Sequence, residues 1–304
     1  MDVLTDVLAA TKVGGAVTAQ LTAFAPWGVR LDDMPKAAFH AVAYGTCWLR
    51  APDGTPIQMG AGDFILLPSG AGHRLSSGPD TAVIPFEEVE VSVGTRHLQI
   101  PGSGAETRLI CGAYRYETKP AHPLMRLLPQ VVHLPADHTA AGRELADTLQ
   151  LLATELAVER PGGQTVTERL VDVLLVQALR LWTARNPESG ASWLAALRDP
   201  EIASTISLLH ESPSHPWTIE ELAARVGVSR ATLARRFTAL VGEPPLAYLS
   251  RWRMDLAARR LRHTSEPLPV IARSVGYTSE FAFSRAFKRT HGEPPATYRS
   301  THRP

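Results

Sequence analysis

The sequence predicts an α+β protein of two parts. The first is a small β-barrel or sandwich followed by a helical hairpin, and the second is an all-α domain with two helix-turn-helix units. Three observations favour this fold class. Short β-like runs fill residues 24–117, apolar residues at helical spacing follow them, and the string GEPP occurs at Gly242 and again at Gly292. At 304 residues, the chain is long enough for two domains that each bury a core.

The N-terminal part is predicted from runs that alternate in polarity or are rich in β-branched residues. These runs are FHAVAYG, CWLRA, DFILLP, TAVIPF and RLICGAYRYE, and Gly, Pro and Asp separate them. Several short strands with turn residues between them are typical of a barrel or a sandwich. We assign residues 1–138 to this domain.

A helical hairpin is expected next. Residues 139–159 and 165–185 carry apolar side chains at helical spacing, and the sequence PGG separates them. Residues 139–186 either cap the barrel or pair with a second subunit. The polar stretch NPESGAS then favours a linker at 187–200, which leaves 201–304 as the C-terminal domain.

Composition narrows the class of protein. The longest apolar runs are shorter than the roughly 20 residues that a membrane span needs, and the first 21 residues lack the pattern of a signal peptide. We therefore expect a cytoplasmic protein that does not enter a membrane. The two cysteines, Cys47 and Cys111, do not form a CxxC pair and are expected to be reduced, buried thiols. An oxidation switch formed by this pair is the alternative.

The net charge of +1 conceals an asymmetry. Residues 1–200 carry 16 Lys and Arg against 21 Asp and Glu, whereas residues 201–304 carry 15 against 9. All but one of the 15 cations are arginines, and Lys288 is the exception. Forked guanidinium groups suit phosphate and guanine contacts, so the C-terminal domain is a candidate for binding nucleic acid.

The two GEPP strings end two copies of one unit. In the first part of the unit, the matching pairs are Leu222 with Ile271, Ala223 with Ala272, Val226 with Val275, and Gly227 with Gly276. In the second part, they are Ser229 with Ser279, Leu233 with Phe283, Arg235 with Arg285, and Phe237 with Phe287. Each copy reads as a short helix, a glycine turn that needs φ > 0, a serine N-cap and a second helix. This order of elements is that of a helix-turn-helix.

The second helix of each copy has a core face and an outward face. At 100° per residue, Phe237 and Leu240 fall within about 40° of Leu233 and point to the core. The outward residues are small or basic, and they suit a helix in a major groove whose arginine reaches a guanine and whose Phe281 packs on a thymine methyl. The candidate DNA-binding residues are Ser229, Arg230, Ala231, Ala234, Arg235 and Thr238 in the first copy, and Ser279, Glu280, Phe281, Ser284, Arg285 and Lys288 in the second.

Between the copies, residues 246–263 predict one long helix rich in Leu, Ala and Arg. A stiff connector would hold two recognition helices at a fixed separation, and major grooves on one face of B-DNA recur about every 34 Å. One chain would then occupy two successive grooves of double-stranded DNA.

The last hundred residues resemble the DNA-binding domain of the AraC/XylS family of bacterial transcription regulators. Three stretches carry the resemblance: GVSRATLARRF, GEPPLAYLSRWRMDLAARRL and PVIARSVGYTSEFAFSRAFKRTHGEPPATYR. It implies seven helices with two helix-turn-helix units, a homodimer, and an activator that contacts RNA polymerase. It also places Ala231, Ala234, Arg235, Glu280, Phe281, Ser284 and Arg285 where family members touch bases or backbone.

The N-terminal part resembles a cupin barrel. GDFILLPSGAGH fits the second cupin motif through Gly62, Pro68, Gly70 and His73. If Gly45 is the turn glycine of the first motif, Ala38 stands where a catalytic cupin has a glutamate ligand. We therefore expect no required cofactor and no metal. His40 and His73, with Cys111 as a further candidate, are the residues that would hold a divalent ion. The expected effector pocket contains His40, Tyr44, Trp48 and His73.

The sequence thus predicts a sequence-specific transcription regulator, not an enzyme, controlled by a small-molecule effector in the barrel. Two alternatives remain at this point. One is a metal-dependent cupin enzyme with a helical tail. The other is a constitutive DNA-binding dimer that has no effector.

Overall fold

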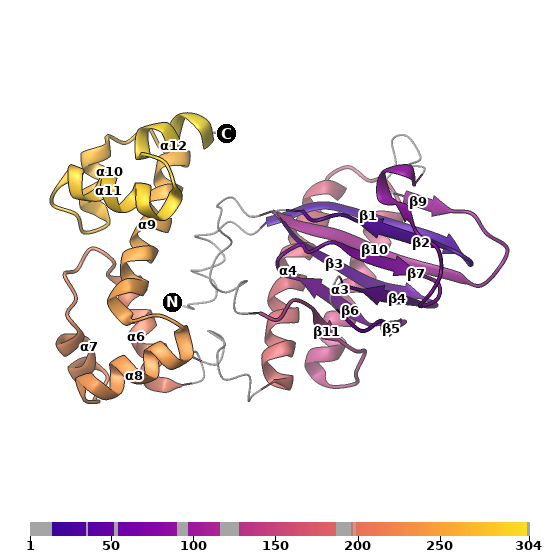
Figure 1. Ribbon diagram of the computed structural model, residues 1–304, viewed down its shortest axis with the longest axis horizontal. Coiled ribbons are helices and arrows are strands. Elements are labelled where there is room, and N and C mark those ends of the chain that lie inside the picture. The colour runs from indigo at the N-terminus through magenta and orange to yellow at the C-terminus, as the bar shows by residue number, and fades with distance from the viewer. Residues whose placement is uncertain are drawn as a thin grey trace. The chain divides into compact units, whose positions relative to one another are not determined.

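The computed structural model describes residues 14–34, 36–51, 54–89, 97–115, 128–186, 196 and 199–302. The chain divides into two compact units, which are considered one at a time (Figure 1). One unit contains strands β1–β11 with helices α3 and α4, and the other contains helices α6–α12. Most of the predicted linker at 187–200 lies outside the described residues. Within the described ranges, no helix is long and apolar enough to cross a membrane.

The strands of the first unit form two sheets. The six-stranded sheet has the order β11-β6-β3-β10-β1-β9, and the five-stranded sheet has the order β5-β4-β7-β2-β8. The strands are β1 (Gly14–Phe24), β2 (Gly28–Leu31), β3 (Lys36–Tyr44), β4 (Thr46–Arg50), β5 (Ile57–Gly60), β6 (Phe64–Leu67), β7 (His73–Ser76), β8 (Ile84–Pro85), β9 (His97–Ile100), β10 (Glu106–Arg115) and β11 (Val132–Leu134). Neighbouring strands are antiparallel except for the pairs β1–β9 and β2–β8.

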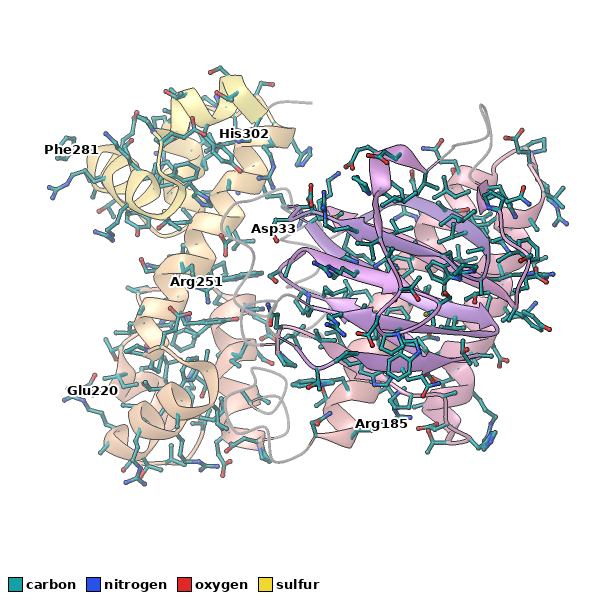
Figure 2. All side chains as sticks on the ribbon, turned by 45° about the vertical axis from the view of Figure 1, so that its right-hand side comes forward. Asp33, Arg185, Glu220, Arg251, Phe281 and His302 are labelled. Atoms are coloured by element: carbon teal, nitrogen blue, oxygen red, sulfur yellow. The ribbon has the colours of Figure 1, made fainter. Side chains whose placement is uncertain are left out.

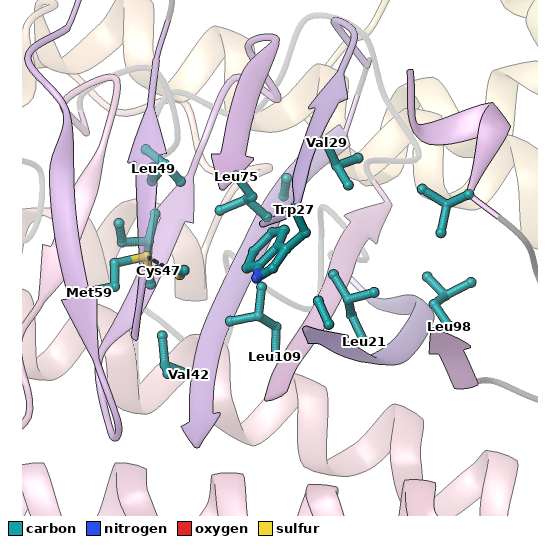
Figure 3. Packing of buried hydrophobic residues seen from close by; sticks show 14 of the residues in the cluster. Leu21, Trp27, Val29, Val42, Cys47, Leu49, Met59, Leu75, Leu98 and Leu109 are labelled. Carbon is teal, nitrogen blue, oxygen red and sulfur yellow. Dashed lines mark hydrogen bonds between the residues drawn. The ribbon is translucent and has the colours of Figure 1, made fainter. Parts of the chain in front are cut away.

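The two sheets face each other as a sandwich, which is one of the two forms expected from the strand pattern. Among the described strands, no hydrogen-bonded ladder joins one sheet to the other. The chain changes sheet between β3 and β4 at Gly45, whose φ of 78° permits the sharp turn. A side chain there would also meet the carbonyl oxygen of Glu106 at 2.3 Å. Residues from both sheets, including Leu21, Leu49 and Leu109, pack between them as one apolar core (Figure 3).

A helical layer covers the other face of the six-stranded sheet (Figure 1). Helix α3 (Ala140–Ala157) begins at Thr139, whose hydroxyl accepts the backbone N–H of Gly142, and α4 (Gly163–Arg185) runs back along it. The apolar face of α3 is buried, as is that of α4. On the sheet, Phe39 stacks on Phe64 with ring centroids 5.7 Å apart. These helices therefore cap the sheet, which is one of the two roles expected for the hairpin.

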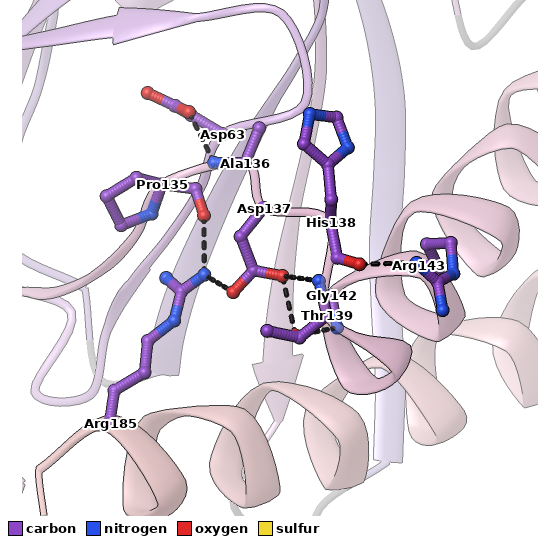
Figure 4. A network of polar contacts seen from close by, with 9 residues as sticks. All are labelled: Asp63, Pro135, Ala136, Asp137, His138, Thr139, Gly142, Arg143 and Arg185. Carbon is purple, nitrogen blue, oxygen red and sulfur yellow. Dashed lines mark hydrogen bonds and ion pairs between the residues drawn. The ribbon is translucent and has the colours of Figure 1, made fainter.

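A polar network fixes both ends of this helical layer (Figure 4). Arg185 at the end of α4 donates to the Pro135 carbonyl at 3.0 Å and forms an ion pair with Asp137. Asp137 in turn accepts the hydroxyl of Thr139 at 2.6 Å. The hydrogen bond from Thr139 and the Arg185 guanidinium lower the pKa of Asp137 to about 2. Asp63 accepts the backbone N–H of Ala136 at 2.8 Å and ties the same segment to the sheet.

In the second unit, all the regular secondary structure of residues 199–302 is helical. The helices are α6 (Pro200–Glu211), α7 (Ile219–Arg225), α8 (Arg230–Val241), α9 (Pro245–His263), α10 (Leu268–Ser274), α11 (Glu280–His291) and α12 (Pro295–His302). Asp199 caps α6 and forms an ion pair with Arg236 of α8. Asp199 and Pro200, which we expected at the end of the linker, are therefore part of this helical unit. Helix α9 is the predicted connector and spans about 28 Å at a rise of 1.5 Å per residue.

Candidate DNA-binding surface and ligand cavity

Two helix-turn-helix units follow the repeat in the sequence. In the first, Gly227 adopts a φ of 74° after α7, and Ser229 caps α8 by accepting the N–H of Thr232 at 3.1 Å. In the second, Gly276 adopts a φ of 84° after α10, and Ser279 caps α11. Only the left-handed backbone at these glycines lets the chain reverse so tightly into the next helix. The repeated glycines and serines thus have the roles that the sequence predicted.

The outward faces of α8 and α11 are set by what each helix buries. Leu233 and Phe237 of α8 and Phe283 and Phe287 of α11 are fully buried. The predicted DNA-binding residues lie on the remaining faces. Ser229, Arg230, Ala231, Arg235, Thr238, Ser279, Glu280, Phe281, Arg285 and Lys288 are exposed, and Ala234 and Ser284 are half-buried.

The arginines of α8 have different roles. Among the described residues, the guanidinium of Arg235 has no hydrogen bond or ion pair, whereas Arg236 pairs with Asp199 and, at 3.2 Å, with Glu201. Although burial raises it, hydrogen bonds from the backbone of Ile202 and from Arg236 hold the pKa of Asp199 below its ordinary value. Arg236 therefore fixes α8 against α6, and Arg235 is available to a ligand. Arg236 was not among the residues predicted from the sequence, although its position about 60° from Leu233 places it on the core side of the helix.

Arg230 is also engaged within the domain. Its guanidinium lies 2.9 Å from Glu220 at the start of the preceding helix, and both side chains are largely exposed. Such a pair contributes little to stability and exchanges easily with a phosphate contact.

Helix α11 presents an exposed aromatic ring. Phe281 is 72% exposed, and Figure 2 shows it projecting from the helices around it. The guanidinium of Arg285, one turn further along, lies 5.7 Å from the centroid of that ring. Among the described residues, Arg285 has no carboxylate partner. The two side chains thus form a paired apolar and cationic surface at the N-terminal half of α11.

The sheet unit contains a cavity of about 220 Å³ between its two sheets. Its wall is largely apolar. It is lined by Ala19, Leu21, Val29, Leu31, Met34, Lys36, Ala38, His40, Leu75, Phe86, Leu98, Cys111, Gly112 and Ala113. A buried apolar space with a few polar groups is typical of a small-molecule site.

His40 in this wall contacts His73. Their Nε2 atoms are 2.7 Å apart, and Nδ1 of His73 donates to the Ala71 carbonyl at 2.8 Å. His73 therefore accepts at Nε2 and His40 donates, so the two facing nitrogens are satisfied with both rings neutral. Among the described residues, the buried Nδ1 of His40 has no hydrogen-bond partner. Burial lowers the pKa of both histidines, and for His40 the neighbouring His73 lowers it further. In the part of the chain that the structure describes, no group of three or more His, Cys, Asp or Glu side chains could hold a metal ion.

The other two residues of the predicted effector pocket lie elsewhere. Tyr44 is 56% exposed and stacks with Arg108, whose guanidinium is 5.6 Å from the ring. Trp48 alternates along β4 with the buried Cys47 and Leu49, so its side chain points away from the core. The structure brings together His40 and His73 but does not bring Tyr44 or Trp48 to the cavity.

Both cysteines are free thiols, and Cys47 is buried whereas Cys111 is half-buried. Cys111 lines the cavity, and Cys47 lies on the neighbouring sheet with its sulfur 4.0 Å from that of Met59. Burial, with a smaller effect of Asp63, raises the pKa of Cys47 to about 12. Burial and the proximity of Cys47 also raise the pKa of Cys111. Both groups are therefore protonated at neutral pH, the form that reacts slowly with oxidants.

A cavity-containing sheet domain joined to a domain with two helix-turn-helix units defines a DNA-binding transcription regulator. Residues 2–184 match the cupin family, and residues 222–301 match a helix-turn-helix domain family. A protein of Streptomyces lividans named as an AraC-like transcription regulator is 40% identical over 309 residues, with 98% of each chain covered. The chain belongs to this AraC-like family of transcription regulators and is not an enzyme.

A further relative by sequence fits this assignment, and a solved structure is similar to the helical part of the chain. The HTH-type transcriptional regulator AlkR of Acinetobacter baylyi is 30% identical over 278 residues, with 90% of each chain covered. Among solved structures, the DNA-binding domain of AdpA in complex with a target DNA is 33% identical with a TM-score of 0.33. That match covers 34% of this chain and 92% of the other.

Proposed function

We propose that this regulator reads DNA with α8 and α11 and that a small molecule in the cavity between the sheets controls its binding. The observation that most supports the reading role is that Arg235 is exposed and has no ion pair with any residue the structure describes, together with the Phe281–Arg285 pair. A guanidinium without an internal partner is free to make a bidentate contact with guanine O6 and N7. Phe281 beside Arg285 suits a thymine methyl next to such a guanine.

The DNA-reading role is tested by removing each arginine. Arg235→Ala and Arg285→Ala should each weaken specific DNA binding by about 1–3 kcal/mol, the effect expected for a lost bidentate base contact. Binding to non-specific DNA should fall less. The measurement is a titration of the full chain with a selected operator and with scrambled DNA at one salt concentration.

Arg169→Ala is the charge-matched control, because Arg169 is exposed on α4 of the other unit. Its operator affinity should equal that of the wild type. Unchanged operator affinity in both Arg235→Ala and Arg285→Ala would refute the assignment.

The cavity supports control by an effector. A ligand that binds only the folded state raises the melting temperature, by the equivalent of about 2.7 kcal/mol at a hundredfold excess over Kd. A thermal-shift screen of metabolites against the full chain identifies such ligands. Ala113→Leu, which narrows the cavity, should abolish the shift that the ligand produces, whereas Ala43→Leu at an exposed position of β3 should leave it intact. A shift that survives in Ala113→Leu would place the effector elsewhere.

We also propose that two chains pair through the helical layer. Four apolar side chains of this layer are exposed: Leu151 by 60%, Val158 at the end of α3 by 51%, and Val166 and Val173 by 44% each. Apolar side chains on the outer side of α3 and α4 suit a contact with a second copy. Sedimentation of the full chain tests this. Contact with RNA polymerase is proposed from the family resemblance, and transcription with purified polymerase tests it. A cytoplasmic location is proposed because a bacterial regulator must reach the DNA.

The cavity is proposed to work without a resident metal and without a disulfide. The His40–His73 hydrogen bond satisfies both facing nitrogens, and the raised thiol pKa values disfavour oxidation. Metal analysis of the purified chain tests the first point, since a stoichiometric divalent ion would contradict it. Mass mapping after mild oxidation tests the second.

A further inference from the structure

Three arginines meet on the outer face of the five-stranded sheet. Arg74 of β7 lies directly opposite Arg30 of β2 on one side and Arg50 of β4 on the other. The neighbours of these residues along each strand, such as Leu49 and Leu75, point into the core between the sheets. By alternation, all three arginine side chains are on the face turned away from that core.

This arrangement is unfavourable for the fold by itself, because like charges directly opposite in a sheet repel each other. Within the domain, few interactions offset the repulsion between these three positive charges. Arg30 lies 3.3 Å from Asp32. Arg50 lies 3.5 Å from Asp80 and donates a hydrogen bond to the Pro79 carbonyl at 3.1 Å. The two carboxylates are 71% and 91% exposed, and such surface pairs contribute little. Among the described residues, the central Arg74 side chain has no hydrogen bond, ion pair or ring contact.

The same three residues line a hollow. Its volume is about 650 Å³, within the range of small-molecule sites, and Leu31, Asp32, Asp33, Ala51, Gly72 and His73 complete the wall. The rim is held in place, since Asp33, labelled in Figure 2, accepts the backbone N–H of Gly72 at 2.5 Å. The hollow is distinct from the cavity between the sheets.

We propose that this hollow binds a small anion that carries at least two phosphate or carboxylate groups. Guanidinium groups bind both kinds of oxyanion with two parallel hydrogen bonds each, and an anion between them removes the repulsion that the free sheet bears. Asp32 and Asp33 are part of the wall, and Asp80 lies beside Arg50, so a longer polyanion that extends past the three arginines would meet these carboxylates. A compact anion fits this charge pattern better than nucleic acid does.

The test uses the full chain with pyrophosphate and citrate as probes, titrated by calorimetry at constant ionic strength. Arg74→Thr should lower the affinity for the probe that binds best by at least tenfold. The same variant without anion should melt at the wild-type temperature or higher, because threonine is well accommodated in a strand and the repulsion is gone. Arg108→Thr is the control, since Arg108 is half-exposed on the other sheet, and it should bind like the wild type.

Any one of the following results would overturn the proposal. The first is that the wild-type chain binds neither pyrophosphate nor citrate. The second is that Arg74→Thr binds the probe as tightly as the wild type does. The third is that Arg74→Thr without anion melts at a lower temperature than the wild type, which would show that Arg74 has a structural role. If the double variant Arg235→Ala, Arg285→Ala no longer bound the probe, the anion would be placed at the recognition helices and the proposal would also be overturned. Tighter, Arg74-dependent binding of double-stranded DNA would replace the small anion with nucleic acid. None of these results bears on the cavity between the sheets, so the proposed effector site stands or falls separately.

Discussion

Phe287→Ala should lower the free energy of unfolding of the DNA-binding domain by about 3–5 kcal/mol, the usual cost of removing a fully buried aromatic ring. The Phe287 ring is 0% exposed and contacts three other rings, those of Phe283, His291 and Tyr298, at centroid distances of 5.8, 4.5 and 5.2 Å. Phe283 and His291 belong to α11 itself, and the contact with Tyr298 holds α11 against α12. We therefore expect the second helix-turn-helix to lose its shape and operator binding to fail at 37 °C.

Phe281→Ala is a matched control, because it removes the same side chain from the same helix at a position that is 72% exposed. Its stability should stay within about 0.5 kcal/mol of the wild type, while its operator affinity falls. Urea denaturation followed by circular dichroism measures the first quantity, and operator titration measures the second. Equal stability losses in the two variants would mean that the faces of α11 are assigned wrongly.

The sequence was sufficient for the helical domain because its signals there are local. Positive-φ glycines at 227 and 276, serine caps at 229 and 279, and apolar residues at helical spacing each fix one feature of the backbone. A repeat doubles each signal. The long connector also emerged from a single run of good helix-forming residues.

The sheets were less predictable because strands depend on their partners. Strand β1 was missed, although its register with β10 extends from Gly14 to Phe24, since its sequence GGAVTAQLTAF begins with two glycines and alternates weakly. Conversely, the run TAVIPF yields only the two-residue strand β8 before a turn of 3₁₀ helix. Whether the strands close into a barrel depends on pairings between distant segments, which local patterns do not encode.

The ligand cavity shows the same limit. His40 was expected in the effector pocket and lines the cavity, but its 2.7 Å contact with His73 requires the particular register of β3 and β6 and the turn that follows. Tyr44 was expected beside them, yet it comes at the end of β3, where the strand leaves the core. The three-arginine face was likewise invisible in the sequence, because Arg30, Arg50 and Arg74 become neighbours only through strand pairing.

Two buried histidines should make the helical domain sensitive to mild acid. His210 stacks on Trp252 with ring centroids 4.0 Å apart and lies 2.7 Å from the hydroxyl of Tyr248. Burial, with a smaller effect of Arg251, lowers its pKa to about 3. Burial also lowers the pKa of His291 to about 4, partly offset by its hydrogen bond with the Met254 carbonyl. Both rings are therefore neutral in the folded domain at pH 5, whereas in the unfolded chain they protonate near pH 6.5.

Unfolding below pH 6.5 consequently takes up protons, and stability falls as the pH falls. Each histidine should contribute a loss of about 1.4 kcal/mol per pH unit, or roughly 2 kcal/mol each between pH 6.5 and pH 5, with no further loss below the folded-state pKa values. Denaturation of the full chain across this range measures the slope. His210→Asn should reduce the slope by one histidine's share even if it also lowers stability at pH 7, whereas His138→Gln, at an exposed position, should leave the slope unchanged. The difference between variants isolates His210 from the buried His40 and His73, which act in the same direction in the sheet unit. Equal slopes in wild type and His210→Asn would show that His210 titrates alike in the folded and unfolded chain, and that its burial imposes no cost on its charged form.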